Sequence, residues 1–421
     1  MSVKIKILGS GREVGRAAIG IEKNGRILLL DYGVNFDEND QPIFPEHVRP
    51  RDLDGVFLTH SHLDHIGAAP YLFVSILPRL YALPVTLDVS RLLLYDMIKL
   101  NGPYLPYDEA TVDDMLGHAE TVHYGDTVEA GMFQFEPLYN GHIPGSAAVL
   151  VHVDGHSILY TSDMNTVETK LMEPARLDGV KADTVIIEST YGASNHPPRV
   201  ETEDHFYHSV LEVVEQGGTV LVPSFSVSRG QEIMSILAER GFDYPVWIDG
   251  MIRQITEIYL AHGEYLRDAG LLAKAASMFR MVKGWQDRRR AYKRPGVIIA
   301  SAGMLKGGPS LYYLKKMFAN PRNAIFLVSY QAPGTPGRRI LEEGVFGEEN
   351  LPVLARVQWF DFSSHTDKRG ILRVLRGVRG LERVVLVHGD PAVQRVLAER
   401  VKEEIGVDVQ IPGNGEEIVL D

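Results

Sequence analysis

The sequence predicts an α/β protein in which one α/β domain is inserted into another, and three observations support this. Residues 1–193 contain short strands joined by tight turns. Residues 194–355 alternate between helix and strand, which indicates parallel crossover units with their own sheet. Residues 356–421 place histidines directly after strands, as the first segment does. We therefore expect the two outer segments to form a single catalytic domain.

The first segment begins with a predicted hairpin. Apolar residues in Ala17–Glu22 and Arg26–Tyr32 flank Lys23-Asn24-Gly25, and an Asn-Gly pair favours a two-residue hairpin turn. A second hairpin is expected where Val149–Asp154 and Ser157–Tyr160 surround Gly155. Helical periodicity or a run of β-branched residues predicts three more elements, namely helices Val85–Leu100 and Asp108–Leu116 and strand Val185–Glu188.

The inserted segment follows a cluster of structure-breaking residues at 193–198. Apolar runs after this cluster predict four strands, namely Thr219–Val222, Pro245–Ile248, Gly296–Ala300 and Ala324–Ser329. Periodic segments between and before them predict four helices, namely 203–216, Arg229–Arg240, 251–262 and Pro309–Phe318.

The last segment is expected to return to the first domain. A strand that begins after Val353 leads to Phe360-Asp361-Phe362-Ser363-Ser364-His365. Further elements follow in the order helix, strand, helix and strand, namely Arg369–Val378, Arg383–Val387, Ala392–Glu404 and 416–420.

Composition excludes several classes of protein. The 421 residues are 45% hydrophobic and include no cysteine, so disulfides and zinc–thiolate sites are excluded. The apolar run at the N-terminus is too short for a signal peptide. No stretch approaches the roughly 18 apolar residues that a membrane-spanning helix needs. We expect a cytoplasmic protein without a membrane partner.

The net charge of -12 alone would argue against a nucleic-acid partner, but the charges are unevenly distributed. Residues 194–355 contain 19 Lys and Arg against 17 Asp and Glu. Five cations lie within the seven residues Arg288–Arg294. They could form a solvated helix end or contact a phosphate backbone. Trp247, Trp285 and Trp359 are expected to pack inside the protein, with base stacking as the alternative.

The most informative motif is His60-Ser61-His62-Leu63-Asp64-His65, which follows the apolar run Gly55–Thr59. A loop at the end of a strand can direct such groups at two neighbouring metal ions. Imidazole and carboxylate ligands suit zinc, and paired metal ions suit hydrolysis. The motif predicts a metallohydrolase.

Three later residues complete two ligand sets. His142 lies among small residues, Asp163 follows strand Ser157–Tyr160, and His388 follows strand Arg383–Val387. Asp163 is expected to bridge the two ions, because a carboxylate has two oxygens. The first ion would take His60, His62, His142 and Asp163, and the second would take Asp64, His65, Asp163 and His388.

These motifs resemble the β-CASP nuclease branch of the metallo-β-lactamase fold. Asp31, the cluster at 60–65, His142 and Asp163 match the motifs of the general fold, in order. Glu188, His365 and His388 resemble the three motifs of the branch. Four further segments are similar to the branch's insertion, namely Pro223–Glu232, Ile248–Met251, Ala300–Met304 and Ser329–Arg339.

The resemblance implies an αββα sandwich that carries an inserted β-CASP domain and holds two zinc ions. It is nearest to the archaeal nucleases related to the cleavage and polyadenylation specificity factor. Such proteins are RNA endonucleases, some with 5′-to-3′ exonuclease activity. The expected partners are single-stranded RNA, a second copy of the chain and other RNA-processing proteins. Two departures are the lack of a KH-type extension before Met1 and Asp390 where glutamate is commoner.

The resemblance also implies roles for individual residues. His365 would protonate the departing 3′-oxygen and Glu188 would orient it, whereas Asp31 would fix a ligand histidine from behind. Asp64 would be both a ligand and a catalytic residue. Five residues of the insertion are expected to bind RNA or its phosphates, namely Ser301, Gly303, Arg229, Gln331 and Arg338.

Two other functions stay open at this point. A small-molecule hydrolase of the same fold, for example a thioesterase, would need only the first cluster, and the insertion and the His365 motif argue against it. A metal-free scaffold in a processing complex would show degenerate ligands, whereas every expected ligand is present.

Overall fold

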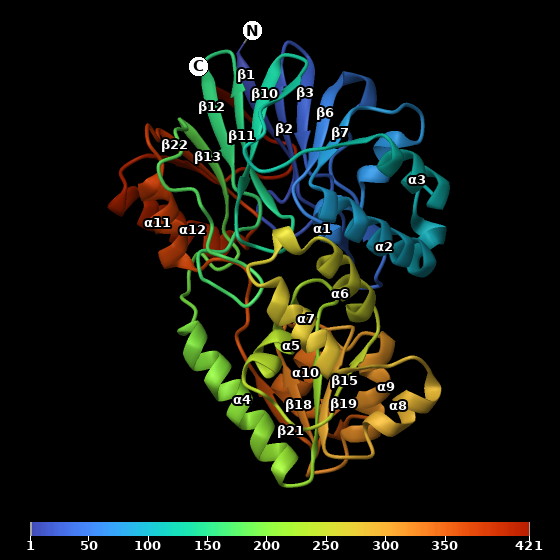
Figure 1. The fold of residues 1–421 in the computed structure, drawn as a ribbon. Helices are drawn as coiled ribbons and strands as arrows, with labels where there is room; N and C mark the ends of the chain where they lie inside the picture. Colours follow the sequence, from blue (N-terminus) through green and yellow to red (C-terminus); the bar gives the residue numbers. More distant parts are fainter. Residues whose placement is uncertain (1, 421) are drawn as a thin grey trace. The chain divides into compact units, whose positions relative to one another are not determined.

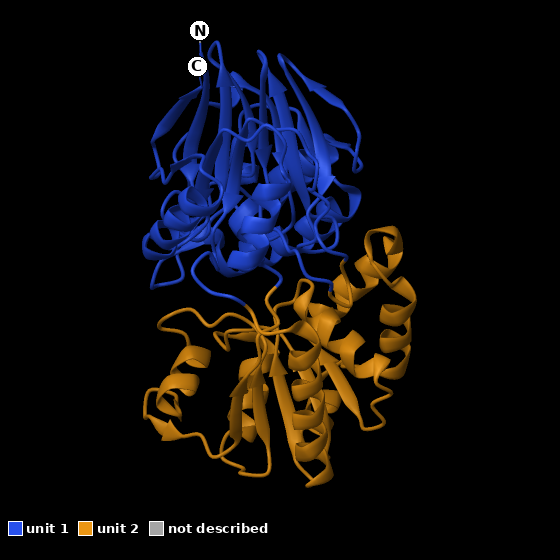
Figure 2. Cartoon of the chain, turned by 90° about the vertical axis from the view of Figure 1, so that its left-hand side faces the viewer, with its two compact units in different colours: residues 1–168, 173–195, 364–421 blue, residues 169–172, 196–363 orange. Residues whose placement is uncertain are grey.

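The computed structural model describes residues 2–420 and divides into two compact units (Figure 2). Unit 1 comprises Met1–Glu168, Glu173–Asn195 and Ser364–Asp421, and unit 2 comprises Thr169–Met172 and His196–Ser363. The chain therefore leaves unit 1, builds most of unit 2 and returns, as expected for an insertion. Within the described residues, no helix combines the length and the apolar character needed to cross a bilayer.

Unit 1 contains two seven-stranded sheets, each antiparallel in one half and parallel in the other. In order, the first sheet contains β24 (Glu417–Leu420), β1 (Val3–Gly9), β2 (Ala18–Lys23), β3 (Arg26–Leu30), β6 (Leu53–Leu58), β7 (Leu80–Ala82) and β8 (Ala119–Thr121). The second contains β23 (Asp408–Gln410), β22 (Arg383–Val387), β13 (Thr184–Glu188), β12 (His156–Tyr160), β11 (Ala147–Val153), β10 (Phe133–Tyr139) and β9 (Val128–Ala130).

The two sheets of unit 1 pack face to face, with helices on their outer faces (Figure 1). The ring of Phe135 from β10 lies 5.5 Å from Phe57 of β6 and 5.3 Å from Tyr81 of β7, so side chains of both sheets meet in the interior. The first sheet is covered by α1 (Leu63–Ile66), α2 (Pro84–Asn101) and α3 (Glu109–Gly117). The second is covered by α11 (Lys368–Gly377) and α12 (Pro391–Glu404). This is the predicted αββα sandwich.

Unit 2 contains a six-stranded sheet whose strands are all parallel. In order, its strands are β16 (Arg280–Met281), β15 (Val246–Asp249), β17 (Gly296–Ala300), β14 (Thr219–Pro223), β18 (Ala324–Leu327) and β21 (Arg356–Trp359). One face packs on α4 (Arg199–Glu215), α5 (Arg229–Glu239), α6 (Ile252–Ala261) and α7 (Ala269–Met278). The other face packs on α8 (Trp285–Ala291), α9 (Gly308–Met317) and α10 (Pro336–Glu343).

Small elements complete the chain. Two short hairpins pair β4 (Asn35–Phe36) with β5 (Pro42–Ile43) and β19 (Val345–Phe346) with β20 (Leu351–Pro352). Single turns of 3₁₀ helix cover Pro50–Asp52, Ala69–Phe73, Gly102–Tyr104 and Gly263–Tyr265.

The predicted alternation of helix and strand in the insertion is confirmed, with corrections that concern one strand, three helices and two tryptophans. The strand Arg356–Trp359, assigned above to the outer domain, pairs with β18 and therefore belongs to the sheet of unit 2. The helices α7, α8 and α10 were not predicted: α8 and α10 are mostly polar, whereas α7 is rich in alanine and leucine. The expected core position of two tryptophans is also wrong, because Trp285 and Trp359 are 60% and 44% exposed.

Candidate metal centre

The predicted ligands of unit 1 lie where neighbouring strands end. β6 leads into His60 and α1, β12 leads into Asp163, and β22 leads into His388. β12, β13 and β22 are parallel neighbours, so their carboxyl ends meet at one edge of the second sheet. His142 comes from the loop between β10 and β11. The fold thus brings together residues that are up to 328 positions apart in the sequence.

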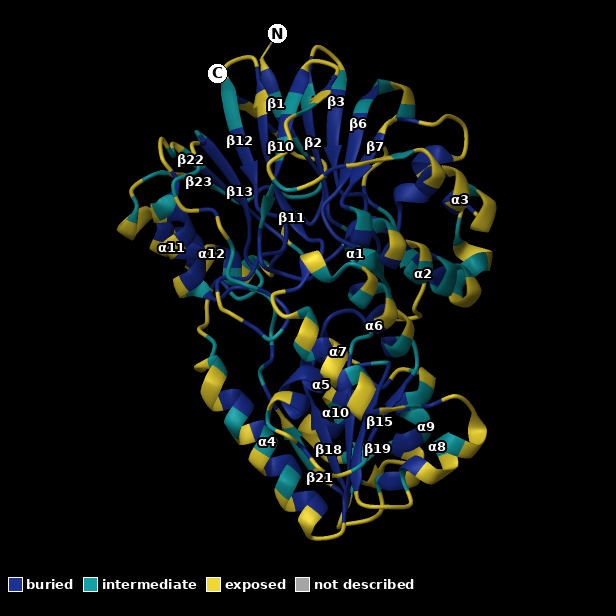
Figure 3. Ribbon diagram, in the orientation of Figure 1, coloured by how far each residue is buried: buried dark blue, intermediate teal, exposed yellow. Residues whose placement is uncertain are grey.

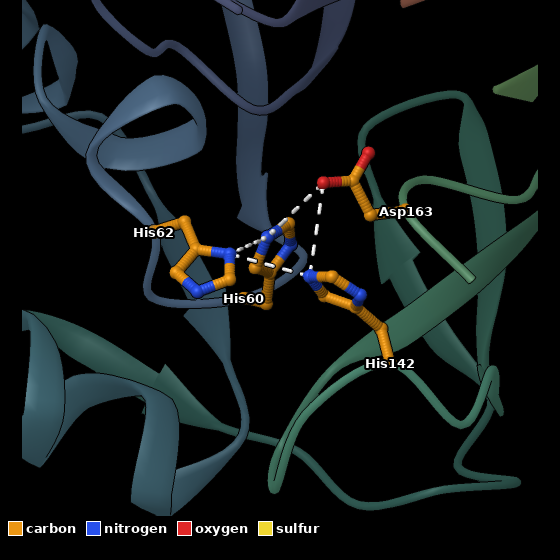
Figure 4. Close-up of side chains that lie close together, drawn as sticks. All are labelled: His60, His62, His142 and Asp163. Atoms are coloured by element: carbon orange, nitrogen blue, oxygen red, sulfur yellow. Dashed lines mark hydrogen bonds and ion pairs between the residues drawn. The ribbon is translucent and has the colours of Figure 1, made fainter. Parts of the chain in front are cut away.

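The first ligand set forms a tight group (Figure 4). Nδ1 of His62 lies 3.1 Å from Nε2 of His60 and 3.2 Å from Nε2 of His142. Oδ2 of Asp163 lies 3.7 Å from Nε2 of both His60 and His142. Two nitrogens bound to one tetrahedral zinc ion lie about 3.3 Å apart, because each is about 2.0–2.1 Å from the metal. The four donor atoms are spaced as zinc requires.

The second ligand set shares Asp163 with the first. Nε2 of His65 lies 3.3 Å from Oδ2 of Asp163, and Nδ1 of His388 lies 3.4 Å from Oδ1. Nε2 of His388 lies 3.3 Å from Oδ2 of Asp64. All four residues offer donor atoms within 4.8 Å of one another. The two sets are therefore those expected from the sequence, and Asp163 joins them.

Buried groups without hydrogen-bond partners support a cation here. Among the described residues, Nε2 of His65 and Oδ1 of Asp163 have no hydrogen-bond partner, although both are buried. A buried polar atom left unpaired is costly, so such atoms indicate an ion or another missing partner. The donor set contains imidazoles and carboxylates only, which suits zinc. The residues present fit such a metal.

The electrostatics of the two sets differ. Burial lowers the pKa of His62 to about 4 and holds the pKa values of His60 and His142 well below the usual range. These three imidazoles are therefore neutral at pH 7, as a metal ligand must be. Burial also disfavours charged His65, but Asp163 and Asp31 raise its pKa well above the usual value.

Asp31 stabilises the loop that carries the ligand histidines His60, His62 and His65. Its Oδ2 lies 2.8 Å from Nδ1 of His65, and Oδ2 also accepts the hydroxyl of Thr59 at 2.8 Å. Its Oδ1 accepts the backbone N–H of Thr59 at 2.7 Å. Because Nδ1 of His65 is bound to Asp31, Nε2 points towards Asp163. A carboxylate behind a ligand histidine fixes both its tautomer and its ring orientation.

His365 lies at the edge of the cluster and is paired with Glu188. Nδ1 of His365 is 2.9 Å from Oε2 of Glu188, and its Nε2 is 3.9 Å from Oδ2 of Asp163. Oε1 of Glu188 accepts the backbone N–H of Met164 at 2.8 Å. Although burial opposes the charged form, Glu188 and Asp163 raise the pKa of His365 to about 9. The side chain of His365 is 22% exposed, more than that of His60, His65 or His142.

Three residues of the site lie in the left-handed region of the backbone. Asp31, Ser162 and His388 have φ angles of 63°, 50° and 51°. Residues with a Cβ avoid this region, and such strain often occurs at functional sites. The turn at His388 is held by its backbone N–H, which donates to the carbonyl of Ser10 at 2.8 Å. After this turn, Asp390 caps α12 by accepting the N–H of Ala392 at 2.8 Å.

Sequence reasoning missed some residues that organise the site. Nδ2 of Asn140 donates to the carbonyl of Asp163 at 2.7 Å, and its Oδ1 accepts the N–H of His142 at 3.4 Å. Asn140 thereby joins the two loops that carry these ligands. The hydroxyl of Thr190 lies 3.1 Å from Nδ1 of His388. No pattern at Asn140 predicts its role, whereas Thr190 lies two residues after Glu188 in a motif already noted.

The expected RNA-binding residues lie in unit 2, where the carboxyl ends of three adjacent strands meet. Ser301 and Gly303 follow β17, and Gln331 follows β18, whereas Arg229 begins α5 after β14. Nε2 of Gln331 donates to the carbonyl of Gly303 at 3.0 Å, so these loops are in contact. Arg338 lies on α10, with its side chain 46% exposed and paired with Glu342 at 2.5 Å.

Two of these residues need correction. Arg229 is buried, and its guanidinium donates to the carbonyl of Val328 at 3.0 Å. Gln331 is only 3% exposed, and its amide also donates to the carbonyl of Ser329 at 3.0 Å. Both side chains therefore hold backbone carbonyls in place, and neither is exposed for RNA. Their polar groups had the right chemistry for RNA, but only the packing shows that they point inwards.

The fold and the site define a class. Two mixed sheets enclosed by helices, with histidines and a shared aspartate at the strand ends, form the architecture of a metallohydrolase. Three family models match the chain: the metallo-β-lactamase superfamily at residues 13–224, the Beta-Casp domain at 231–340, and the Zn-dependent metallo-hydrolase RNA specificity domain at 350–412. The chain belongs to the β-CASP family of the metallo-β-lactamase superfamily.

Curated relatives extend over almost the whole chain. It is 49% identical to RNase aCSPSF2 of Saccharolobus solfataricus over 100% of this chain and 86% of that protein. It is 35% identical to Probable RNase MJ4 of Methanocaldococcus jannaschii, over 99% of this chain and 100% of that protein. It is also 35% identical to the transcription termination factor FttA of Pyrococcus horikoshii, over 99% of this chain and 71% of that protein.

A solved structure shares the fold. The crystal structure of a protein of unknown function from Enterococcus faecalis matches with a TM-score of 0.64 and 14% identity, and the match covers 100% of both chains. At this identity the likeness concerns the fold alone.

Proposed function

We propose that the protein is a zinc-dependent ribonuclease that hydrolyses phosphodiester bonds of single-stranded RNA. The observation that carries the proposal is the Glu188–His365 pair beside the shared carboxylate Asp163. A metal cluster alone would serve many hydrolases, but a paired histidine at its edge suits a reaction with a poor leaving group. The names of RNase aCSPSF2 and Probable RNase MJ4 support the same activity.

Two zinc ions per chain are proposed as the cofactor. His60, His62, His142 and Asp163 would hold one ion, and Asp64, His65, Asp163 and His388 the other. Zinc would supply charge neutralisation for the phosphate and activation of water. A third possible group combines Asp163, Glu188, His365 and His388. We assign Glu188 and His365 to proton transfer instead, because Glu188 is already bound by His365 and by the N–H of Met164.

Residues near the two metal sites are proposed to transfer a proton and to hold the ligands in position. Glu188 accepts from Nδ1 of His365, which leaves Nε2 facing the cluster with its proton. From this position Nε2 can protonate the oxygen that leaves the phosphorus atom, and such general acids contribute about 10²–10⁴ in rate. Asp31 holds the ring of His65, and Asn140 holds the loops of His142 and Asp163. Asp64 holds His388 in place, because its Oδ2 lies 3.3 Å from Nε2 of that histidine.

Finer properties remain proposals of the same kind. Endonuclease cleavage is proposed as the main activity, with 5′-to-3′ exonuclease cleavage as a second. Roles in 3′-end maturation or decay, a homodimer, other RNA-processing partners and a cytoplasmic location are also proposed. Arg338, whose side chain is 46% exposed, is proposed to contact RNA phosphates. Ser301, Gly303, Arg229 and Gln331 are buried and would only shape the loops of this region.

One experiment tests the function against its main alternative. Purified protein with measured zinc content is given single-stranded RNA labelled at either end, with a 5′-phosphate or a 5′-hydroxyl, and in parallel a thioester substrate. Cleavage of RNA by the wild type, lost in Asp163→Asn together with zinc, is the expected result. Hydrolysis of the thioester with the RNA left intact would overturn the proposal in favour of a small-molecule hydrolase.

A further inference from the structure

An aromatic cluster lies on the surface of unit 2, beside the cationic segment Arg288–Arg294. Trp285 begins α8 and is 60% exposed. Its ring lies 5.5 Å from that of Tyr312 on α9, with an angle of 76° between the ring planes. Tyr312 lies 6.3 Å from Tyr292, which follows α8. Of the three aromatic residues only Trp285 is exposed, and its contact with Tyr312 holds the ring at the surface, where a partner can reach it.

A buried carboxylate fixes the position of α8. Asp249, which is 2% exposed, accepts two hydrogen bonds from Arg288, at 2.8 and 3.0 Å. Asp249 also accepts the hydroxyl of Tyr313 at 2.8 Å. The guanidinium carbon of Arg288 lies 5.1 Å from the centre of the Trp285 ring, a cation–π contact. The sequence left open whether Arg288 contacts phosphate, and the structure instead makes it the anchor of the helix.

Three of the remaining cations of this region, Arg289, Lys293 and Arg294, are exposed to solvent. Residues 283–294 contain six cations and a single acid, Asp287, in a chain whose net charge is -12. Within the described chain, Lys293 and Arg294 are exposed and form no ion pair. Arg289 is exposed, and its Nε donates to the carbonyl of Trp285 at 3.3 Å. Figure 3 shows exposed residues along α8.

We propose that this surface, consisting of Trp285, Tyr312, Arg289, Lys293 and Arg294, binds single-stranded RNA, with a base stacked on Trp285 and phosphates on the cations. A fixed, exposed aromatic ring beside cations is the combination that recognises single strands without regard to sequence. The opposite charges of the surface and the RNA backbone favour this partner. The proposal rests on the ribonuclease function above and adds a second RNA contact, in the unit that does not carry the metal cluster.

Binding is measured separately from cleavage, by tryptophan fluorescence and filter binding with a 20-nucleotide oligouridylate. All proteins also carry Asp163→Asn, so that the RNA survives. Trp285→Ala should weaken binding by about 5- to 150-fold and remove most of the fluorescence quenching, because stacking of one base on an aromatic ring is worth about 1–3 kcal/mol. Trp285→Phe keeps an aromatic face and should bind within about threefold of the parent.

A charge reversal tests the phosphate contacts. Arg289→Glu with Lys293→Glu should weaken binding at least about tenfold and reduce the salt dependence of binding. A matched control, Arg373→Glu with Lys402→Glu, changes the net charge equally on exposed positions of α11 and α12. It should bind within about twofold of the parent. Circular dichroism and the melting temperature verify that each variant is folded.

The outcomes separate the two proposals. Unchanged binding and quenching in both the Trp285→Ala and the charge-reversal variants would overturn the RNA-binding surface and leave a protein partner as its occupant. An equal loss in the Arg373→Glu and Lys402→Glu control would also overturn it, because only total charge would matter. If the Asp163→Asn protein binds oligouridylate through this surface but the wild-type protein cleaves no RNA, the ribonuclease function fails and the surface stands.

Discussion

Nδ1 of His365 lies 2.9 Å from Oε2 of Glu188, and the second oxygen of the same carboxylate accepts the backbone N–H of Met164 at 2.8 Å. Glu188 is 1% exposed and lies at the end of a central strand, so it cannot turn away. The imidazole is thereby fixed, with Nε2 directed at the metal cluster. Two residues separated by 177 positions in the sequence thus form one hydrogen-bonded pair.

The first prediction concerns His365. His365→Ala should reduce the rate of RNA cleavage by about 10²–10⁴, because the leaving oxygen loses its proton donor. Zinc content, measured by mass spectrometry, should stay that of the wild type, since His365 is in neither proposed ligand set. His118→Ala, an exposed histidine at the end of α3, is the control. Unchanged cleavage with full zinc would exclude the role of His365 as the acid.

The second prediction concerns Asp31. Asp31→Asn should lower zinc affinity by about 10- to 100-fold, because it weakens the support of the His65 ring. Competition with a chromophoric chelator measures this affinity. Asp54→Asn, which removes a carboxylate bound to Arg26 on the same sheet, should leave the affinity unchanged. Equal affinities in the Asp31→Asn variant and the wild type would show that the contact has no influence on the metal.

The third prediction concerns removal of the metal. Chelation should abolish RNA cleavage and lower the melting temperature, because a ligand that binds only the folded state stabilises it. Buried His60, His65 and Asp163 would then lose their shared partner. Titration with zinc should restore cleavage at two equivalents per chain. Full restoration at one equivalent, or full activity after chelation, would contradict the proposed pair of ions.

The fourth prediction concerns acid stability in unit 2. Oδ2 of Asp361 lies 2.6 Å from Nδ1 of His196. Although burial opposes it, His196 lowers the pKa of Asp361 below its usual value of 3.8. The contribution of this pair is therefore complete above pH about 4 and is lost as the pH falls through the lowered pKa. Asp361→Asn should cost about 1.5–3 kcal/mol at pH 7 and less at pH 3.

Denaturant unfolding at both pH values measures the loss. Asp243→Asn, on an exposed loop of the same unit, should cost little at either pH. A constant difference between wild type and Asp361→Asn from pH 7 to pH 3 would refute the linkage to this carboxylate.

Four strands of unit 2 (β14, β15, β17 and β18) and four of its helices (α4, α5, α6 and α9) were predicted, because each strand is a short apolar run and each helix has a periodic apolar face. The helices α8 and α10 were not predicted, since their residues are mostly polar and few of them are buried. The helix α7 was missed although its residues are mostly apolar. β21 was assigned to the wrong domain for a different reason. Its sequence says that it is a strand, but only the pairing with β18 says which sheet it joins.

The candidate site was predictable to a large degree because its residues follow strands, where local sequence marks both the strand and the loop. The hydrogen bonds that hold these ligand loops in position were harder to predict. Asn140 has no pattern around it, and its function depends on two loops that meet only in the folded chain. For Arg229 and Gln331 the prediction was wrong. Their polar groups suggested that they bind RNA, but both side chains are buried and are not available to it.

The sequence by itself determined which metal-binding side chains are available. Six residues of the two proposed ligand sets lie in short motifs that directly follow predicted strands, so local sequence was enough to find them. The tertiary structure alone decided how they combine. It directs both oxygens of Asp163 towards histidines from opposite ends of the chain, and it anchors Arg288 to Asp249 so that Trp285 faces outwards. The reason is that such pairings depend on sheet order and packing, which no local pattern encodes.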